Sequence, residues 1–149
     1  MEYKRILLGT DGSEPMEAVY EHCAYLAGLT HATVDIVYIL DMDGVQPELA
    51  VLEADTENVY NDLLAAGDKI VEDAKRALLS RGVDEKAITV AVLEGNPWDE
   101  IHTYVKRQAI DLVVIGKHRR KGVSRFHIGS VAERVIRGTE VPVLVVRAM

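Results

Sequence analysis

Short apolar runs alternate with helical patterns four times along the chain, and this order constrains the fold more than any other feature of the sequence. Such alternation is typical of a parallel sheet whose strands are joined by crossover helices. The predicted strands are residues 3–9, 33–40, 88–94, 111–115 and 141–146. Because such crossovers are right-handed, five strands and four helices predict an open, doubly wound parallel sheet of the α/β class with helices on both faces.

Turn and capping residues delimit four helices between these strands. The predicted helices are residues 15–27, residues 58–80, a segment that starts at Pro97, and residues 130–137. Ser13 is the candidate N-cap of the first helix, Pro15 takes an early helical position, and Gly28 ends it. Asn96 is the candidate N-cap of the third helix, and Gly138 ends the fourth.

Composition limits the class of protein. With 149 residues, 48% apolar and 28% charged, we expect one globular domain over residues 1–149. No apolar run approaches the roughly 20 residues of a membrane-spanning helix, so no membrane association is expected. The single cysteine, Cys23, and the very short apolar run near the start favour a cytoplasmic protein without a signal peptide. The net charge of −7 argues against general nucleic-acid binding, and the six acids of residues 41–57 predict a solvated loop.

Residues 111–136 predict an anion site. They read as a buried strand, a basic loop punctuated by glycine, and a helix whose first residues are Gly129 and Ser130. Backbone N–H groups at a helix N-terminus lack intrahelical partners and carry the positive end of the helix dipole, so they favour a phosphate. Five Lys or Arg residues and no acid lie from Lys117 to Arg125. The positive charge is therefore concentrated where phosphates would bind.

The predicted strand order, 3-2-1-4-5, places a ligand site at the switch point of the sheet. Ligands of open α/β sheets bind beyond the carboxyl ends of the strands, where the winding direction reverses. The first and fourth strands flank that point, and their carboxyl ends are the tripeptides Gly9-Thr10-Asp11 and Gly116-Lys117-His118. These two loops form the predicted binding site.

The two loops and the segments around them resemble the universal stress protein family. The phrases ILLGTDGSEP and DLVVIG match, and Gly116, Gly129 and Ser130 fall at the spacing of the Gly-x2-Gly-x9-Gly-Ser motif of its ATP-binding members. The likeness runs from near residue 5 to near residue 147. It implies an adenine nucleotide α-hydrolase-like version of the predicted fold. It also implies ATP as the ligand, with AMP or ADP as alternatives, and Mg²⁺ or Mn²⁺ held through the phosphates.

The resemblance also implies which residues contact the nucleotide. Asp11 and the main chain of Gly9 and Thr10 would meet the adenosine, and Ile39 would bond adenine through its backbone. The residues around the ribose and phosphates would be Ile115, Gly116, His118, Arg119, Gly129, Ser130 and Val131. From the residues alone, two of these roles have ordinary alternatives, because Asp11 can bond its own turn and Ser130 can be a plain N-cap.

One position departs from the motif, since Arg119 stands at its second glycine. If that position needs a positive φ, an arginine would be strained there by about 1 kcal/mol or more. A guanidinium beside the polyphosphate could instead make bidentate contacts with it. The sequence leaves both open, and with them two functions: an ATP-binding regulator, or a nucleotide-free interaction module of the same fold.

Motifs of other chemistries are absent from the sequence. It has no P-loop, no G-x-G-x-x-G, no H-E-x-x-H, no zinc spacing and no G-x-S-x-G, so no metal held by the protein itself is expected. Near the phosphate loop the acid–base candidates reduce to Asp11 and His118, which predicts no enzyme, or at most slow ATP hydrolysis. An adenylating enzyme would need a first loop such as S-G-G-x-D-S, which TDGSEP is not.

The residues and the resemblance together predict a cytoplasmic, homodimeric, nucleotide-binding stress-response regulator whose protein partner is unknown. The last predicted strand begins at Val141 and ends at Val146, and it is an apolar edge of the sheet. Bare edges invite pairing with another chain. Pairing with a second copy across a two-fold axis, as the resemblance implies, would cover it.

Overall fold

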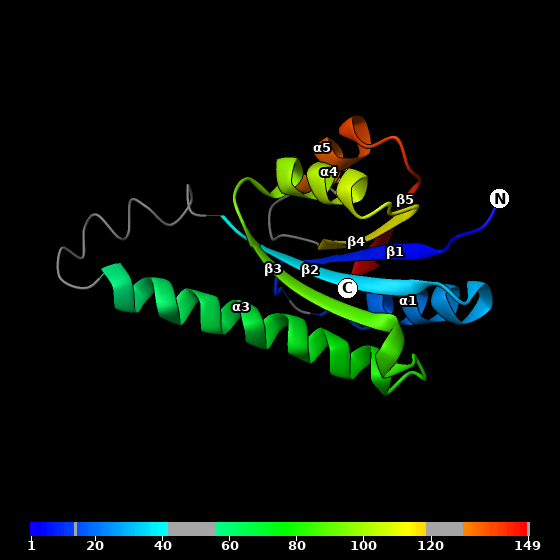
Figure 1. Ribbon diagram of the computed structural model, residues 1–149, viewed down its shortest axis with the longest axis horizontal. Coiled ribbons are helices and arrows are strands. Elements are labelled where there is room, and N and C mark those ends of the chain that lie inside the picture. The colour runs from blue at the N-terminus through cyan, green and yellow to red at the C-terminus, as the bar shows by residue number, and fades with distance from the viewer. Residues whose placement is uncertain (14, 42–55, 119–129, 149) are drawn as a thin grey trace.

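The computed structural model describes residues 1–13, 15–41, 56–118 and 130–148, whose arrangement is shown in Figure 1. The elements, in chain order, are β1 (Arg5–Thr10), α1 (Glu17–Thr30), β2 (Thr33–Leu40), α3 (Thr56–Leu79), the 3₁₀-helix η1 (Glu85–Ala87), β3 (Ile88–Glu94), α4 (Pro97–Arg107), β4 (Leu112–His118), α5 (Ser130–Gly138) and β5 (Val143–Ala148). All the predicted strands and helices are present. Within the described ranges, no helix combines the length and the apolar character needed to cross a membrane.

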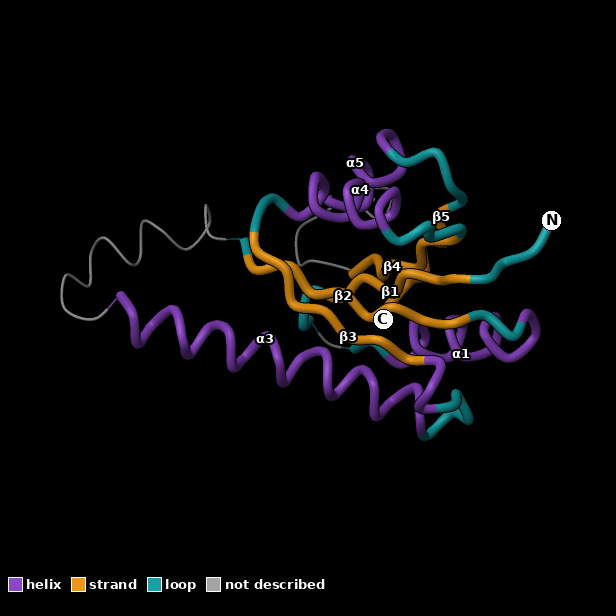
Figure 2. The backbone as a smooth tube through the Cα atoms, viewed as in Figure 1, coloured by secondary structure: helices purple, strands orange, loops and turns teal. Residues whose placement is uncertain are grey.

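The five strands form one parallel sheet in the order β3-β2-β1-β4-β5, which confirms the predicted topology. Helices α1 and α3 cover one face of the sheet, and α4 and α5 cover the other (Figure 2). The central strand β1 pairs with β2 on one side and β4 on the other. The winding direction therefore reverses at β1.

Each face of the sheet has its own hydrophobic core. Ile6 and Leu8 of β1 belong to the core beneath α1 and α3, whereas Leu7 belongs to the core beneath α4 and α5. All three side chains are fully buried. Successive side chains of a strand point to opposite faces, so a strand covered on both sides reads as an unbroken apolar run. Burying each such side chain stabilises the fold by about 1.5–3 kcal/mol, which makes β1 an anchor of both cores.

The first helix begins later than predicted. Met16 occupies the N-cap position of α1, so the predictions of Ser13 as N-cap and of Pro15 inside the helix were wrong. The backbone N–H and the hydroxyl of Ser13 both donate to the Asp11 carboxylate instead. A serine engaged in a turn with the preceding aspartate is not available to cap a helix that starts several residues later.

The first helix also ends later than predicted. It continues through Gly28 to Thr30, whose hydroxyl donates to the Leu26 carbonyl at 2.7 Å. A glycine inside a helix costs about 1 kcal/mol relative to alanine, and burial of the neighbouring Ala27 offsets that cost. The C-cap is His31, which adopts the left-handed conformation with φ of 57°, so the prediction that Gly28 ends the helix was wrong.

Other element ends shift by a few residues. β4 extends to His118 rather than ending at residue 115, because it pairs with β5 as far as Ala148. β5 begins at Val143 rather than at residue 141, and α5 includes Gly138 as its last residue. The short helix η1 was not predicted. Of the predicted acidic loop, residues 42–55 lie outside the described residues, and the last two positions open α3.

A buried carboxylate ties α4 to the amino ends of the strands. Asp35 of β2 is 1% exposed and accepts two hydrogen bonds from the Arg5 guanidinium, at 3.0 Å from Nε and 2.7 Å from Nη2. The Tyr104 hydroxyl donates a third at 2.6 Å. Burial and the hydrogen bond to Asp35 raise the pKa of Tyr104 to about 12, so its hydroxyl remains a donor at neutral pH. Several charge-assisted bonds compensate the desolvation of this carboxylate.

Removing a donor of this network should lower the free energy of unfolding less than removing its acceptor. Tyr104→Phe loses one hydrogen bond and should lower the free energy of unfolding by about 1 kcal/mol. Asp35→Ala leaves the Arg5 guanidinium without its counter-ion and should cost about 3 kcal/mol or more. Urea unfolding measures both, with Tyr25→Phe as the control, because that side chain is 66% exposed. Equal stabilities of the two Tyr→Phe variants would contradict this role of Tyr104.

The thiol of Cys23 should be unreactive in the folded protein. The side chain is 0% exposed, and burial raises the pKa of its thiol from 9.0 to about 12. Because the thiolate is the reactive form, Ellman's reagent at about pH 8 should label the folded protein far more slowly than the unfolded chain. Since the unfolded chain loses this proton first, the stability that is present below pH 9.0 should fall as the pH rises toward 12. Cys23→Ala should reduce that fall, and rapid labelling of the folded protein would contradict the burial.

Candidate functional site

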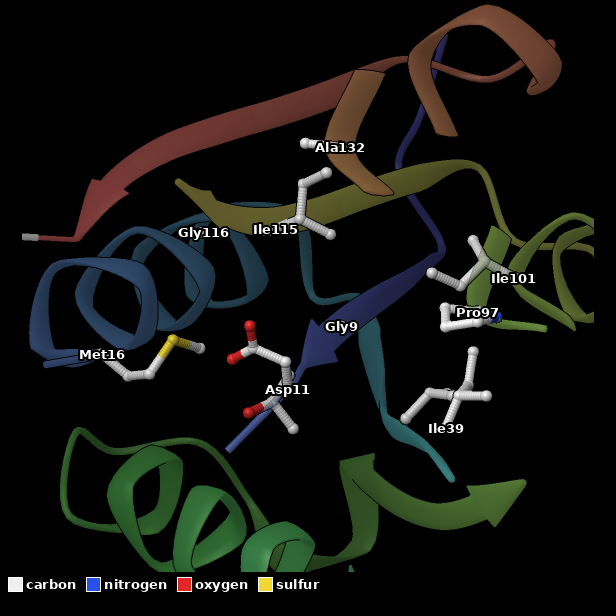
Figure 3. Close-up of a pocket in the computed structure, with 11 residues that line it drawn as sticks. Gly9, Asp11, Met16, Ile39, Pro97, Ile101, Ile115, Gly116 and Ala132 are labelled. Atoms are coloured by element: carbon white, nitrogen blue, oxygen red, sulfur yellow. The ribbon is translucent and has the colours of Figure 1, made fainter. Parts of the chain in front are cut away.

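A pocket of about 150 Å³ opens at the carboxyl ends of β1 and β4. Figure 3 shows that its walls are mostly apolar side chains, with the carboxylate of Asp11 directed into the opening. The lining residues are Gly9, Thr10, Asp11, Met16, Val37, Ile39, Pro97, Ile101, Ile115, Gly116 and Ala132. The pocket therefore lies at the predicted switch point of the sheet.

Several residues predicted as nucleotide contacts line this one pocket. They come from three strands and the turn after β1, and they are Gly9, Thr10, Asp11, Ile39, Ile115 and Gly116. Of the remaining predicted residues, His118 ends β4, and Ser130 and Val131 open α5. Arg119 and Gly129 lie outside the described residues. Both interpretations of Arg119 therefore stay predictions.

The pocket forms where β1 and β4 part. Their ladder ends at the pair Leu8–Val114, and both strands continue beyond it. Gly9 is the first residue of β1 past that pair, and a Cβ there would lie 3.1 Å from Cγ2 of Ile115. Such a contact is closer than nearly all side-chain contacts, so glycine at this position lets Ile115 pack against the β1 backbone. The two strands thus define the floor of the pocket.

The chain leaves β1 through a turn held by its own side chains. The Asp11 carboxylate accepts from the backbone N–H of Ser13 at 2.9 Å, and Oγ1 of Thr10 accepts from the N–H of Gly12 at 3.2 Å. Gly12 has a φ of 79°, and a Cβ there would lie 2.7 Å from Cδ1 of Ile70. Both observations require glycine. The turn interpretation of Asp11 is confirmed, and its carboxylate lines the pocket as well.

Asp11 is the only ionisable side chain among the described residues that line the pocket. Burial raises the pKa of the neighbouring Tyr38, and the negative charge of Asp11 raises it further. In the described parts of the chain, no three His, Cys, Asp or Glu side chains gather closely enough to hold a metal ion. The described pocket thus offers one carboxylate, backbone groups and apolar walls, an arrangement that suits binding.

β2 presents an open backbone edge to the pocket. Its ladder with β1 ends at the pair Thr10–Tyr38, whereas β2 itself continues to Leu40. The Leu40 carbonyl accepts from the N–H of Gly95, beyond β3, at 3.1 Å. Because adjacent residues of a strand direct their backbone groups to opposite sides, the N–H and C=O of Ile39 point away from β3. The Ile39 N–H therefore bonds the Thr10 carbonyl in the last pair of the β1 ladder, and the Ile39 C=O lies beyond that pair and faces the pocket.

Five lining residues were not predicted from the sequence, namely Met16, Val37, Pro97, Ile101 and Ala132. Some could have been found. Val37 lies two residues before Ile39 and so on the same face of β2. Pro97 opens the helix that follows β3, with Asn96 as the predicted N-cap, which is confirmed by its side chain accepting from the N–H of Asp99 at 3.4 Å. In a parallel sheet the carboxyl ends of β3 and β1 lie at the same end of the strands. The start of α4, which follows β3, is therefore expected near the pocket.

α5 borders the pocket and is joined to α4 by a cation–π contact. The helix begins at Ser130, and Ala132 in its first turn lines the pocket. The amino terminus of α5, with the positive end of its dipole, therefore lies beside the pocket. The Arg134 guanidinium of the same helix lies 4.1 Å from the centroid of the Trp98 ring in α4.

A second cavity, of about 130 Å³, lies between the end of α4 and the turn that precedes β5. His102 and Thr139 line it, together with Lys106 and Glu140. The carboxyl ends of α4 and α5 border this cavity, and the negative end of a helix dipole disfavours phosphate. It also contains none of the residues predicted to contact a nucleotide. The pocket at the switch point is therefore the candidate site.

Known proteins share both the sequence pattern and the fold. A universal stress protein of Methanocaldococcus jannaschii is 32% identical over 97% of this chain and 82% of its own length. The solved structure of a second universal stress protein of that organism is 26% identical, with a TM-score of 0.79 over 100% of this chain and 99% of its own.

Two further universal stress protein structures share the fold at lower identity and contain nucleotides. One is a complex with cAMP, 22% identical, with a TM-score of 0.69 over 100% of both chains. The other, from Archaeoglobus fulgidus, is a complex with dAMP, 21% identical, with a TM-score of 0.69 over 97% of this chain and 98% of its own. The sequence pattern that defines the universal stress protein family matches residues 2–147. The chain therefore belongs to the universal stress protein family.

Proposed function

We propose that this protein, acting as one domain over residues 1–149, binds an adenine nucleotide in the pocket at the switch point. The ligand is ATP, with AMP or ADP as alternatives. The main support is that predicted contact residues from β1, β2 and β4 line one pocket. The cAMP and dAMP complexes of the two fold relatives support adenine as the base.

The base would lie in the apolar part of the pocket, between β2 and α4. Val37 and Ile39 come from β2, and Pro97 and Ile101 come from α4. The backbone C=O of Ile39 offers an acceptor at this wall. Adenine presents an acceptor at N7 beside a donor at N6, whereas guanine presents two acceptors along the same edge. A backbone acceptor can bond the N6 donor of adenine but not the O6 acceptor of guanine, so it favours adenine in that orientation.

The ribose and phosphates would lie at the other side of the pocket. The Asp11 carboxylate can accept from a ribose hydroxyl, because an ionised carboxylate has lone pairs beyond those used in its turn. The phosphates would extend toward the amino terminus of α5, whose dipole favours negative charge. We assign the contacts there to Gly116, His118, Arg119, Gly129, Ser130 and Val131. Mg²⁺ or Mn²⁺ would be held through phosphate oxygens.

Binding would be accompanied by little or no catalysis, in a cytoplasmic stress-response regulator whose protein partner is unknown. A hydrolase needs a general base within about 3 Å of the attacking water, or a base that reaches the attacking water through one bridging water molecule. Among the described lining residues Asp11 alone could act as a base, and its carboxylate already holds the turn. The alternative is a nucleotide-free module of the same fold, which Arg119 favours because a large side chain stands where the motif has glycine.

We further propose a homodimer that pairs along β5, the edge strand of the sheet. The Pro142 carbonyl accepts from the N–H of Val113 at 3.0 Å, so alternate residues from Pro142 onward direct their backbone groups to β4. Val143 and Val145 alternate with these residues, so their backbone N–H and C=O groups point outward, away from β4. A second copy could bond to these outward groups across a two-fold axis and cover the apolar edge.

Filling the pocket should remove nucleotide binding without loss of the fold. Ala132 is 7% exposed, and Ala132→Leu would place extra methyl groups in the space proposed for the nucleotide. Isothermal titration of the wild type with Mg²⁺ and ATP should give a Kd in the micromolar to submillimolar range, and a weaker one with GTP. The variant should bind at least about tenfold more weakly. Ala65→Leu, the same change at an exposed position of α3, is the matched control.

Two outcomes would contradict the proposed function. A wild type that binds neither ATP, ADP nor AMP would favour the nucleotide-free module. Equal affinities of Ala132→Leu and Ala65→Leu would mean that the nucleotide binds elsewhere.

Blocking the outward edge of β5 should give a folded monomer. Val145→Pro removes one outward N–H and leaves the groups that bond β4, and proline is tolerated at a sheet edge in that orientation. Val145→Thr keeps the N–H and the β-branched shape, so it should remain dimeric. Sedimentation velocity distinguishes monomer from dimer, and circular dichroism checks the fold. A Val145→Pro protein that stays dimeric with native circular dichroism would exclude pairing through this strand.

A further inference from the structure

We propose that Arg134 is a positioning residue of the nucleotide pocket, a role that rests on the proposed nucleotide binding. By stacking on Trp98, Arg134 would fasten α5 to α4 and so fix the separation of two pocket walls. Neither side chain lines the pocket. The effect on the ligand is therefore indirect.

The contact lies next to the wall residues of both helices. Pro97 and Ile101 of α4 and Ala132 of α5 line the same pocket, and Figure 3 shows them around one opening. Trp98 directly follows Pro97, and Arg134 lies two residues after Ala132. A movement of α5 away from α4 would therefore both break this contact and separate the two pocket walls.

α5 has few other anchors. Among its described side chains only Ala132 and Val135 are buried, and Ala132 is small. The helix packs on α4 more extensively than on either β4 or β5 taken singly, so α4 supports it together with the sheet. A cation within about 6 Å of a tryptophan centroid is attracted to the ring face, and the observed 4.1 Å lies well inside that limit. The aliphatic stem of an arginine can also cover apolar surface on the way to its charged head.

The second arginine of α5 does not share this contact. Arg137 pairs with Glu133 of its own helix at 2.6 Å and is 77% exposed. Arg137→Ala therefore removes the same charge from the same helix without touching Trp98. The chain has one tryptophan, so tryptophan emission reports on the surroundings of Trp98, which include this contact.

The expected effect on binding follows from the position of the α5 amino terminus. Phosphates would be held by backbone N–H groups at that terminus, which must lie at a fixed distance from the base between β2 and α4. If the contact is lost, α5 occupies the binding arrangement for only part of the time. The apparent Kd then rises in inverse proportion to that fraction.

The test is titration with ATP and Mg²⁺ of four proteins, together with their tryptophan emission. Arg134→Ala should raise the Kd about three- to tenfold, and Arg134→Lys, which keeps a cation, should raise it less. Arg137→Ala should bind as the wild type does. In the absence of ligand, the emission of Trp98 should change in Arg134→Ala and stay unchanged in Arg137→Ala.

A double variant separates positioning from a general loss of stability. Trp98→Leu should weaken binding about as much as Arg134→Ala, and the two changes together should add little, because either one removes the contact. A wild-type Kd in Arg134→Ala would overturn the positioning role while leaving the proposed nucleotide binding intact. Additive effects of the two changes would overturn it as well. A wild type that binds no nucleotide would instead refute the proposed function, and the positioning role with it.

Discussion

The pairing of β1 with both β2 and β4 determines where the rest of the site lies. The ladder of β1 with β4 stops at Leu8–Val114, while its ladder with β2 continues to Thr10–Tyr38. Helix α3, which follows β2, and helix α5, which follows β4, lie on opposite faces of the sheet, so among the described residues a pocket forms between the faces at the carboxyl end of β1. The pocket at this point is thus a consequence of the strand order, and the glycine at position 9 then sets how closely Ile115 approaches.

The two ends of the sheet serve different purposes, and α4 connects them. At the amino ends, Tyr104 bonds the buried Asp35, which fixes the carboxyl half of α4 to β2. At the carboxyl ends, Pro97 and Ile101 of the same helix form a pocket wall. α4 is therefore a wall held by a buried polar network. α5 has no comparable bond among its described residues; Ala132 and Val135 pack in the core, and Arg134 stacks on Trp98.

Strand order and the position of the site could be predicted from the sequence because both depend on local patterns: apolar runs, helical spacing and glycine turns. What depends on distant partners could not. Asp35 interrupts an apolar strand, and its partner Tyr104 lies 69 residues away, so no local pattern reveals the network. The prediction of Ser13 as N-cap was wrong because Ser13 bonds back to Asp11 in the turn and the helix begins only at Glu17. The wall residues of α4 and α5 were missed because they look like ordinary apolar helix residues in the sequence. Only the topology brings them together at the pocket.

Much of the proposed recognition would be made by the main chain: the Ile39 carbonyl of β2, the β4 backbone at Gly116 and the amino terminus of α5. Groups of this kind come with the fold, so a side chain that differs from the family motif, such as Arg119, need not remove them. What main-chain recognition does require is that its parts stay at fixed distances. β1, β2 and β4 are fixed by their ladders and α4 by Asp35, which leaves the placement of α5 as the variable on which the proposed nucleotide affinity would depend.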